Sequence, residues 1–401
     1  MKPADGPGRL LIAASIPEMI EVFLLPYARH MRSLGWQVDA LANGASGSEL
    51  LRATFDNVHD ADWSRNPLDP RNLIGLPREL REMMLKGAYD VVHVHSPVAG
   101  FLVRFALRKK NRPRVVYTAH GFHFHKTAGR IRNFIFRSLE KIASPWTDEL
   151  IVINSEDFEA AKRLHLVPTG HLHFLPGIGV DLNRFHFQPL SHEEVLARRR
   201  ALDLPADEQL VLMVAEFIPR KRHEDALNAF SAVWSGAHLL LVGKGPLEDE
   251  MRQHASALGL GRRVHFLGYR DDVPELMAIS KLLLLPSLQE GLPMSVIEAM
   301  SMGVPVIGTD IRGTRDLLSG GAGVLVPTNS PAALAHAMNA LLADKEHREL
   351  LRRNARERVR EYDLGPLLEV HRELYEKLRD SVRRDLEAEA KAIAAAESVP
   401  D

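Results

Sequence analysis

The sequence predicts an α/β fold made of two doubly wound parallel-sheet domains. Short apolar runs rich in Val, Ile and Leu alternate with helical patterns from one end to the other. This alternation occurs twice, with a turn-rich segment at 176–185 between the two sets. The 401 residues exceed what one hydrophobic core usually serves, and a hydrophobic content of 45% is ample for two cores.

The expected strands are almost wholly apolar, which is typical of parallel sheets buried on both faces. In the first domain they cover residues 10–14, 37–42, 91–95, 115–119, 150–154 and 172–175. In the second domain they cover residues 210–215, 239–242, 264–267, 282–285, 304–308 and 324–326.

We place the domain boundary near residue 185, ahead of a charged helix expected at 193–202. The first domain is then 1–185 and the second 186–365. Residues 366–401 form a C-terminal helical segment with a frayed tail, which we expect to pack back on the first domain. Two such domains facing each other would form a cleft lined by the carboxyl ends of both sheets, where open α/β sheets bind ligands.

Composition excludes several classes of function. The formal net charge of -1 gives no global reason to expect nucleic-acid binding. Cysteine is absent, which excludes disulfides and thiolate metal sites and fits a reducing compartment. No apolar run is long enough to span a bilayer, and the first residues lack a signal-peptide core. We therefore expect a soluble, cytoplasmic protein.

Two carboxylates, Glu290 and Glu298, lie eight positions apart around a predicted strand-to-helix turn. Gly291 and Pro293 mark the turn, and the unpaired amides at the start of the following helix favour anionic phosphate. Carboxylates on either side of a phosphate site can accept hydrogen bonds from polyol hydroxyls, which suits a nucleotide-diphospho-sugar. The alternative is a pair of favourable dipole charges on a solvated helix face.

Several motifs resemble those of the bacterial retaining glycosyltransferases of the GT-B fold. In family order they are 91–97 (VVHVHSP), 117–124 (YTAHGFHF), 179–181 (GVD), 241–246 (LVGKGP), 290–298 and 303–307 (GVPVI). The segment 63–68 (WSRNPL), together with 118–124, is similar to capsule, exopolysaccharide and lipid-linked oligosaccharide transferases. The resemblance covers almost the whole chain and is specific only when the motifs are taken together.

The resemblance implies roles for particular residues. Glu290 would hold hydroxyls of the transferred sugar, Glu298 the ribose hydroxyls, and Lys221 would neutralise the leaving diphosphate. Further donor contacts are implied for Gly291, Leu292, Pro293, Met294, Ser295, Arg220, Tyr269 and Arg270, the last two near the nucleobase together with Val273.

The diphosphate loop departs from the family at Glu216, where many relatives carry Arg. The missing phosphate contact would then come from Arg220 or Arg222. Apart from the resemblance, a basic turn of this kind is usually a solvated surface.

His120 ends an apolar strand and precedes Gly121, so its ring can project from the carboxyl edge of the sheet. The resemblance implies that it contacts the donor sugar or supports the departing phosphate. The alternative is a buried, satisfied histidine.

A zinc site is a second interpretation of the histidines in this region. His93 and His95 share one side of a strand, and His123 and His125 repeat the spacing. No carboxylate motif with ligand spacing accompanies them, and the resemblance implies an enzyme that works without a bound metal. We expect neither a metal nor a cofactor.

The acceptor side is expected near Ser15, Glu18 and His123. The family's glycine-rich loop after the first strand is absent, so Ser15 and Glu18 would shape acceptor recognition instead of binding phosphate.

Residues 104–142 carry a strong local positive charge. Glu140 is their only acid, and the eleven basic residues are Arg104, Arg108, Lys109, Lys110, Arg112, Arg114, Lys126, Arg130, Arg132, Arg137 and Lys141. Apolar residues recur among them at helical spacing, which fits either an anionic membrane surface or core packing. We expect peripheral association with the inner face of the cell membrane.

The function expected is a metal-independent, retaining glycosyltransferase of hexosyl or N-acetylhexosaminyl type. It would move a sugar from a nucleotide-diphosphate donor, such as a UDP-N-acetylhexosamine, to a growing lipid-linked glycan. The alternatives are a nucleotide-sugar epimerase of the same fold and a non-catalytic sugar-nucleotide-binding protein.

Overall fold

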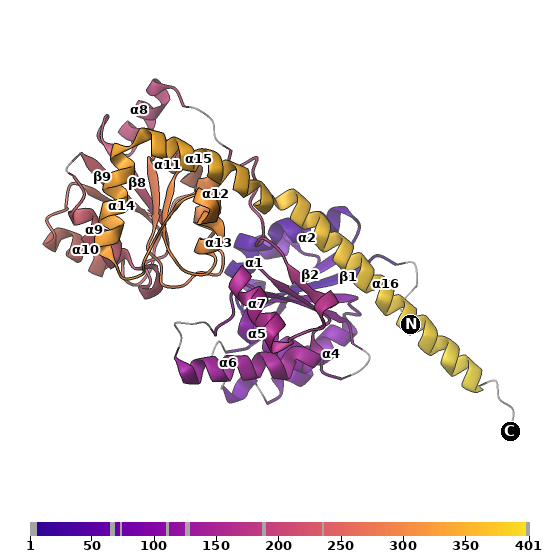
Figure 1. The fold of residues 1–401 in the computed structure, drawn as a ribbon. Coiled ribbons are helices and arrows are strands. Elements are labelled where there is room, and N and C mark those ends of the chain that lie inside the picture. Colours follow the sequence, from indigo (N-terminus) through magenta and orange to yellow (C-terminus); the bar gives the residue numbers. More distant parts are fainter. Residues whose placement is uncertain are drawn as a thin grey trace. The chain divides into compact units, whose positions relative to one another are not determined.

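The computed structural model describes residues 6–64, 69–72, 74–109, 112–124, 129–186, 190–234 and 236–397, with no side-chain description beyond 393. The chain divides into two compact units. The first unit comprises Met1–Ile178 and Gly365–Asp401, and the second comprises Gly179–Leu364 (Figure 1).

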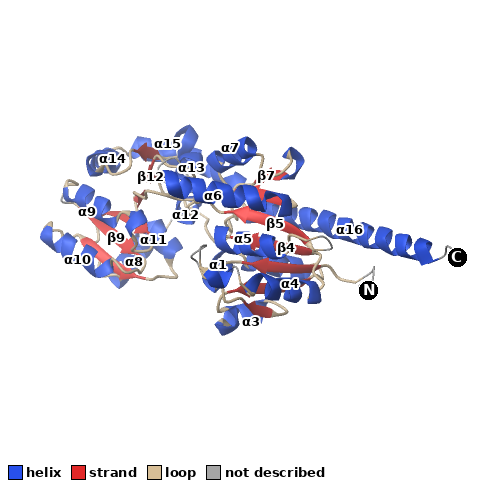
Figure 2. Cartoon of the chain, turned by 90° about the horizontal axis from the view of Figure 1, so that it is seen from below, coloured by secondary structure: helices blue, strands red, loops and turns tan. Residues whose placement is uncertain are grey.

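The first unit contains a seven-stranded parallel sheet in the order β3-β2-β1-β4-β5-β6-β7. Figure 2 labels its strands β4, β5 and β7. Its strands are β1 (Arg9–Ala13), β2 (Gln37–Ala42), β3 (Val58–Asp60), β4 (Val91–His95), β5 (Arg114–Ala119), β6 (Glu149–Val152) and β7 (Leu172–Phe174). Its helices are α1 (Pro17–Phe23), α2 (Leu25–Ser33), α3 (Glu49–Thr54), α4 (Leu76–Lys86), α5 (Pro97–Ala106), α6 (Arg130–Ala143), α7 (Ser155–Leu164) and α16 (Leu364–Glu397).

Strand β4 shows how the two faces of this sheet differ. Val92 and Val94 belong to the apolar core beneath α4 and α5. The alternate residues, His93 and His95, point to the opposite face, where α2 and α16 supply aromatic side chains. The first unit thus has one apolar face and one face with buried polar rings.

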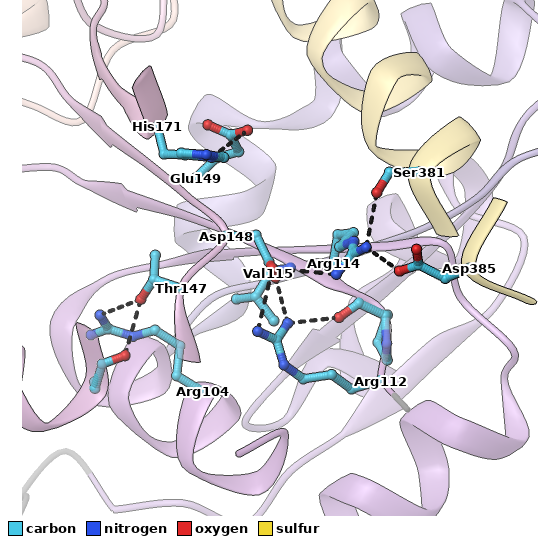
Figure 3. A network of polar contacts seen from close by, with 12 residues as sticks. Arg104, Arg112, Arg114, Val115, Thr147, Asp148, Glu149, His171, Ser381 and Asp385 are labelled. Atoms are coloured by element: carbon cyan, nitrogen blue, oxygen red, sulfur yellow. Dashed lines mark hydrogen bonds and ion pairs between the residues drawn. The ribbon is translucent and has the colours of Figure 1, made fainter. Parts of the chain in front are cut away.

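Helix α16 packs along the first unit at several points. Glu369 lies 3.2 Å from His30 of α2, and Tyr375 is fully buried. Further along, Arg114 at the start of β5 donates to Ser381 at 2.8 Å and pairs with Asp385 (Figure 3). The C-terminal helix therefore completes the face of the sheet that carries His93 and His95.

The second unit contains a six-stranded parallel sheet in the order β10-β9-β8-β11-β12-β13. Its strands are β8 (Gln209–Val214), β9 (Ala237–Val242), β10 (Val264–Gly268), β11 (Leu282–Leu285), β12 (Val306–Thr309) and β13 (Val324–Val326). Its helices are α8 (His192–Ala201), α9 (His223–Ser231), α10 (Glu248–Ala257), α11 (Val273–Ile279), α12 (Met294–Ser301), α13 (Thr314–Leu318), α14 (Pro331–Ala343) and α15 (Lys345–Val359).

All twelve predicted strands are present, and both sheets are parallel as predicted. The prediction missed β3, a three-residue edge strand in which His59 and Asp60 leave no apolar run. The units divide at Ile178, earlier than the expected residue 185, because Val180 and Phe185 are buried in the core of the second unit. Among the described residues, no helix is long and apolar enough to cross a membrane.

Candidate functional site

In the second unit, an ion pair joins the loops that follow β8 and β11. Lys221 Nζ lies 2.6 Å from Glu290 Oε1, and the two side chains are 13% and 7% exposed. Arg220 Nη1 lies 3.5 Å from Glu290 Oε2, and the amide of Leu288 donates to the carbonyl of Arg220 at 2.8 Å. Three residues that the sequence assigned to the donor site are therefore brought together.

The loop after β12 packs against the backbone at Glu290 and Gly291. Gly313 has a φ of +75°, and a Cβ there would lie 2.1 Å from the carbonyl oxygen of Gly291. Only glycine permits this approach of two backbones. The neighbouring Arg312 is 6% exposed, and its Nε donates to the carbonyl of Glu290 at 3.3 Å. Arg312 was not predicted from the sequence, because its contact is with a backbone carbonyl that no side-chain motif reveals.

Helix α12 begins directly after the loop that follows β11 and carries Glu290. Pro293 is its N-cap, so the first amides of the helix belong to Met294 and the residues after it. The amides of Met294 and Ser295 have no partner within the helix and carry its positive dipole, whereas Val296 donates to the carbonyl of Pro293 at 3.2 Å. Glu298 lies about one turn further on, where burial raises its pKa to about 7 and Arg184 opposes the shift. The carboxyl of Glu298 is thus about half protonated near neutral pH.

Two other arginines predicted to lie near the donor, Arg222 and Arg270, form hydrogen bonds with neighbouring carboxylates. Arg222 donates to both oxygens of Asp225, at 2.9 and 2.7 Å. Arg270 donates to Asp272 at 2.7 Å, and this pairing raises the pKa of Arg270. Arg222 is therefore held beside its own helix, whereas Arg220 lies against Glu290.

Other expected residues on this unit lie further away or point to solvent. Tyr269 is 69% exposed and, like Arg270, follows β10, which β9 and β8 separate from β11. Glu216 is exposed directly after β8. Gly245 allows the loop after β9 to approach this segment, because a Cβ there would lie 2.6 Å from the carbonyl of Phe217.

In the first unit, His120 lies at the carboxyl edge of β5 and bonds to His95 at the end of β4. The distance from His95 Nδ1 to His120 Nε2 is 2.9 Å. The rings of His93 and His95 lie side by side, tilted by 37°, with their centroids 4.1 Å apart. Burial lowers the pKa of His120 to about 4 and holds those of His93 and His95 well below the usual value. All three rings are therefore neutral at pH 7.

The edge next to His95 contains a pair of serines. The hydroxyls of Ser15 and Ser96 lie 2.6 Å apart, and Ser96 also accepts a hydrogen bond from the amide of Ser15 at 3.2 Å. Trp63 Nε1 donates to the carbonyl of Ser15 at 3.0 Å. Ser96 has φ +69° and ψ 147°, a conformation that is nearly restricted to glycine. A strained residue thus follows His95 at the end of β4.

The other residues expected on the acceptor side are more scattered. Glu18 is exposed in the first turn of α1. His123 lies in the loop after β5, with its ring 4.8 Å from that of Phe136 in α6. Residues 65–68 of the predicted motif and His125 lie outside the described residues.

The zinc interpretation does not match the contacts of the histidines. His93 bonds to Tyr375 and Thr118, and His95 bonds to His120. Among the residues that the structure describes, no three His, Asp or Glu side chains are placed to hold a metal ion.

The positive segment 104–142 has two parts with different surroundings. Arg104 is buried and paired with Glu140 at 2.9 Å, while Arg112 and Arg114 pair with Asp148 in the network of Figure 3. These three cations serve internal contacts. The basic residues of α6 are exposed: Arg130, Arg132, Arg137 and Lys141. Lys110 and Lys126 lie outside the described residues.

Part of the apolar stripe of α6 faces outward, while Ile135 and Leu139 are half-buried. Ile131 is 79% exposed, Phe134 73% and Ile142 53%. Of the two interpretations of this stripe, core packing is therefore wrong for these three residues.

Comparison with known proteins accounts for nearly the whole chain. Residues 20–184 match the description "Glycosyltransferase Family 4", and residues 196–358 match "Glycosyl transferases group 1". The Bacillus subtilis protein EpsD, named a glycosyltransferase, is 31% identical over 378 residues, which cover 93% of this chain and 97% of EpsD. An Escherichia coli enzyme named UDP-Gal:alpha-D-GlcNAc-diphosphoundecaprenol alpha-1,3-galactosyltransferase is 30% identical over 285 residues, which cover 69% of this chain and 71% of the enzyme.

Solved structures agree with this assignment at the level of the fold. Anabaena HepE in complex with UDP and glucose superimposes with a TM-score of 0.77 at 20% identity, covering 92% of this chain and all of that one. Two parallel-sheet units and a C-terminal helix, together with this match, confirm the GT-B fold. The chain belongs to the group 1 and family 4 glycosyltransferases.

Proposed function

We propose that this protein is a retaining glycosyltransferase that moves a hexosyl or N-acetylhexosaminyl group from a UDP-sugar to a lipid-linked diphosphate glycan. The observation that carries the proposal is the buried pair of Glu290 and Lys221 at the start of α12. In this proposal the Glu290 carboxylate accepts hydrogen bonds from sugar hydroxyls, and the neighbouring Lys221 is the cation that binds phosphate. The relatives support the acceptor class, since two are named for diphosphoundecaprenol-linked sugars.

In this proposal the second unit holds the donor. Glu290 accepts hydrogen bonds from hydroxyls of the transferred sugar, and Glu298 from those of the ribose. The diphosphate lies on Lys221, Arg220 and the segment Gly291, Leu292, Pro293, Met294 and Ser295, whose amides begin α12. Tyr269 and Arg270 border the nucleobase. Arg220 replaces the cation that Glu216 does not provide, because Arg222 is already bound to Asp225.

The reaction itself is a substitution at the anomeric carbon. The bond from that carbon to the phosphate oxygen breaks, and the acceptor hydroxyl forms a new bond on the same face of the sugar. The hydroxyl proton goes to the departing phosphate, so that UDP and the extended glycan are the products. Lys221, Arg220 and the helix amides stabilise the charge that develops on the diphosphate, and His120 donates a hydrogen bond to it or to the sugar.

We also propose that α6 attaches the protein to the membrane that holds its acceptor. The exposed Ile131, Phe134 and Ile142 form one stripe, and Arg130, Arg137 and Lys141 lie along one side of it. An apolar stripe bordered by cations fits an anionic bilayer surface. Ser15, Glu18 and His123 would then meet the glycan end of the acceptor.

The donor assignment is tested first by thermal shift with a panel of nucleotide-sugars, then by product analysis with lipid extract. Glu290→Ala should lower transfer by at least about 100-fold, because a charged hydrogen bond to the reacting sugar is lost. Glu357→Ala, an exposed carboxylate of α15, is the matched control and should leave transfer unchanged. Transfer at the wild-type rate by Glu290→Ala would overturn the assignment.

The same assays separate the alternatives. A transferase releases UDP and forms product only with an acceptor, whereas an epimerase converts the donor alone. A binding protein would shift its melting temperature without turnover.

The membrane proposal is tested by flotation with liposomes that contain anionic lipid. Ile131→Ser with Phe134→Ser should abolish flotation, while Ile74→Ser, which alters an apolar side chain of the first unit that is 77% exposed, should not. Equal flotation of all variants, or flotation insensitive to salt, would refute this surface.

A further inference from the structure

We propose that His95 is a positioning residue, which fixes the tautomer and ring orientation of His120. The inference rests on the proposed function, in which His120 contacts the donor. It adds a residue that the sequence analysis considered only as a metal ligand.

The first step is the geometry of the pair. β4 and β5 are neighbouring parallel strands, and their register brings His95 and His120 to the same edge. The Nδ1–Nε2 distance of 2.9 Å is that of a direct hydrogen bond, and the ring planes are 29° apart. Between two neutral rings such a bond holds one proton, so one ring donates and the other accepts. The tautomer of His120 is therefore determined by that of His95.

The second step is what holds His95 in place. The ring of His93 lies beside that of His95, tilted by 37°, with the centroids 4.1 Å apart. Both nitrogens of His93 are engaged, Nδ1 with the Tyr375 hydroxyl at 2.5 Å and Nε2 with Thr118 Oγ1 at 2.7 Å. His93 cannot rotate without losing both bonds. The three imidazoles thus form a column that is anchored by α16 at one end and carries His120 at the other.

The third step is the charge state of the column. Burial keeps His93, His95 and His120 neutral at pH 7, and His371 from α16 adds to the penalty for charging any of them. If both rings were charged, a donor would stand on each side of the N···N bond. The pair therefore keeps a single shared proton throughout the physiological range.

The direction of the bond follows from the chemistry at His120. A departing phosphate gains negative charge, so a donor is the useful partner. We assign the proton of the pair to His95 Nδ1, which donates to His120 Nε2. A neutral His120 then carries its own proton on Nδ1, where it can donate to a phosphate or sugar oxygen.

The kinetic test compares two substitutions of His95. Asn retains an N–H close to the position of Nδ1, and Leu removes it. His95→Leu should lower kcat about 10- to 100-fold, as removal of a hydrogen-bonded supporting partner does elsewhere, with the donor KM changed less than about threefold. His95→Asn should stay within about threefold of wild type. A drop in donor affinity with kcat intact would overturn the proposal.

Two controls exclude a merely structural effect. His371→Asn alters another buried histidine of the same face, whose Nδ1 bonds to the carbonyl of Leu367, and it should leave kcat unchanged. In the His120→Ala background, His95→Leu should lower kcat by no more than about twofold further, because its effect passes through His120. An equal loss in His371→Asn, or independent losses in the double variant, would contradict the assignment.

A measurement without turnover keeps the proposal separate from the proposed function. Nitrogen-15 NMR of labelled histidine should show His120 protonated on Nδ1 in the wild type and a mixture of tautomers in His95→Leu. A wild-type His120 protonated on Nε2 would overturn the inference. Absence of any glycosyl transfer by the wild type, with the Nδ1 tautomer present, would instead refute the proposed function.

Discussion

Acidification should destabilise the first unit through its buried histidines. The pKa of His120 and of His371 is lowered to about 4 by burial, and those of His93 and His95 are lowered as well. In the unfolded chain a histidine has a pKa near 6.5. Above a pH of about 6.5 these rings contribute their full stabilisation of the folded state. Between a pH of about 6.5 and about 4 only the unfolded chain takes up protons, so the stabilisation is lost as the pH falls.

The magnitude follows from linkage. Between pH 7.5 and 5.5, each histidine whose folded pKa is about 4 contributes a loss of about 1.4 kcal/mol. His120 and His371 together should therefore lower the free energy of unfolding of the first unit by about 3 kcal/mol over this pH range. His93 and His95 should lower it further.

The second unit provides an internal comparison, because its shifted groups oppose each other. Because His223 has a pKa of about 4, it should lower the free energy of unfolding of the second unit by about 1.4 kcal/mol over the same pH range. The raised pKa of Glu298, about 7, has the opposite sign: protonation in the folded state recovers about 2 kcal/mol between pH 7.5 and 5.5. The stability of the second unit should hardly change.

The assay is urea unfolding at both pH values, followed by tryptophan fluorescence. Trp36 and Trp63 are buried in the first unit, and Trp234 is in the second. Trp234→Phe restricts the signal to the first unit, and His371→Asn should remove about 1.4 kcal/mol of its pH dependence. A loss below about 1 kcal/mol in the first unit, or equal losses in both units, would refute the reasoning.

Three further predictions concern single residues. Arg220→Ala should raise the donor KM about tenfold or more, whereas Arg222→Ala should mainly lower the melting temperature, because Arg222 is bound to Asp225; steady-state kinetics and thermal unfolding of both variants decide this, and similar KM values would contradict it. Donor affinity should rise about tenfold from pH 6 to pH 8, as Glu298 with its pKa near 7 loses its proton, and Glu298→Gln should abolish that dependence in calorimetric titrations; a dependence that survives in the variant would exclude Glu298 as its source. Ser96→Gly should be more stable than Ser96→Ala by about 1–2 kcal/mol, because both lose the hydroxyl and only glycine relieves the positive φ; denaturant unfolding with the reverse order would show that Ser96 is not strained.

The sequence was sufficient for the parts of the fold that depend on local pattern. Each long apolar run became a strand, and Lys221 and Glu290 met because both follow strands of one parallel sheet, β8 and β11, which are neighbours. β3 was missed because its pairing with β2, and not its own composition, makes it a strand.

The features of the site that the sequence did not predict depend on contacts between segments far apart in the chain. The role of His95 needs the register of β4 with β5 and the return of α16, whose Tyr375 lies 282 positions from His93. Periodicity showed that α6 has an apolar stripe, but not that part of the stripe points outward. Arg312 acts through a backbone carbonyl, which no side-chain motif reveals.

The return of α16 determines the order in which the chain can mature during synthesis. The sheet of the first unit emerges early, but the face that bears His93 is covered only when Tyr375 and the rest of α16 have been made. The whole second unit, Gly179–Leu364, is complete before that helix leaves the ribosome. This face of the first sheet can therefore be covered only after the whole second unit has been translated.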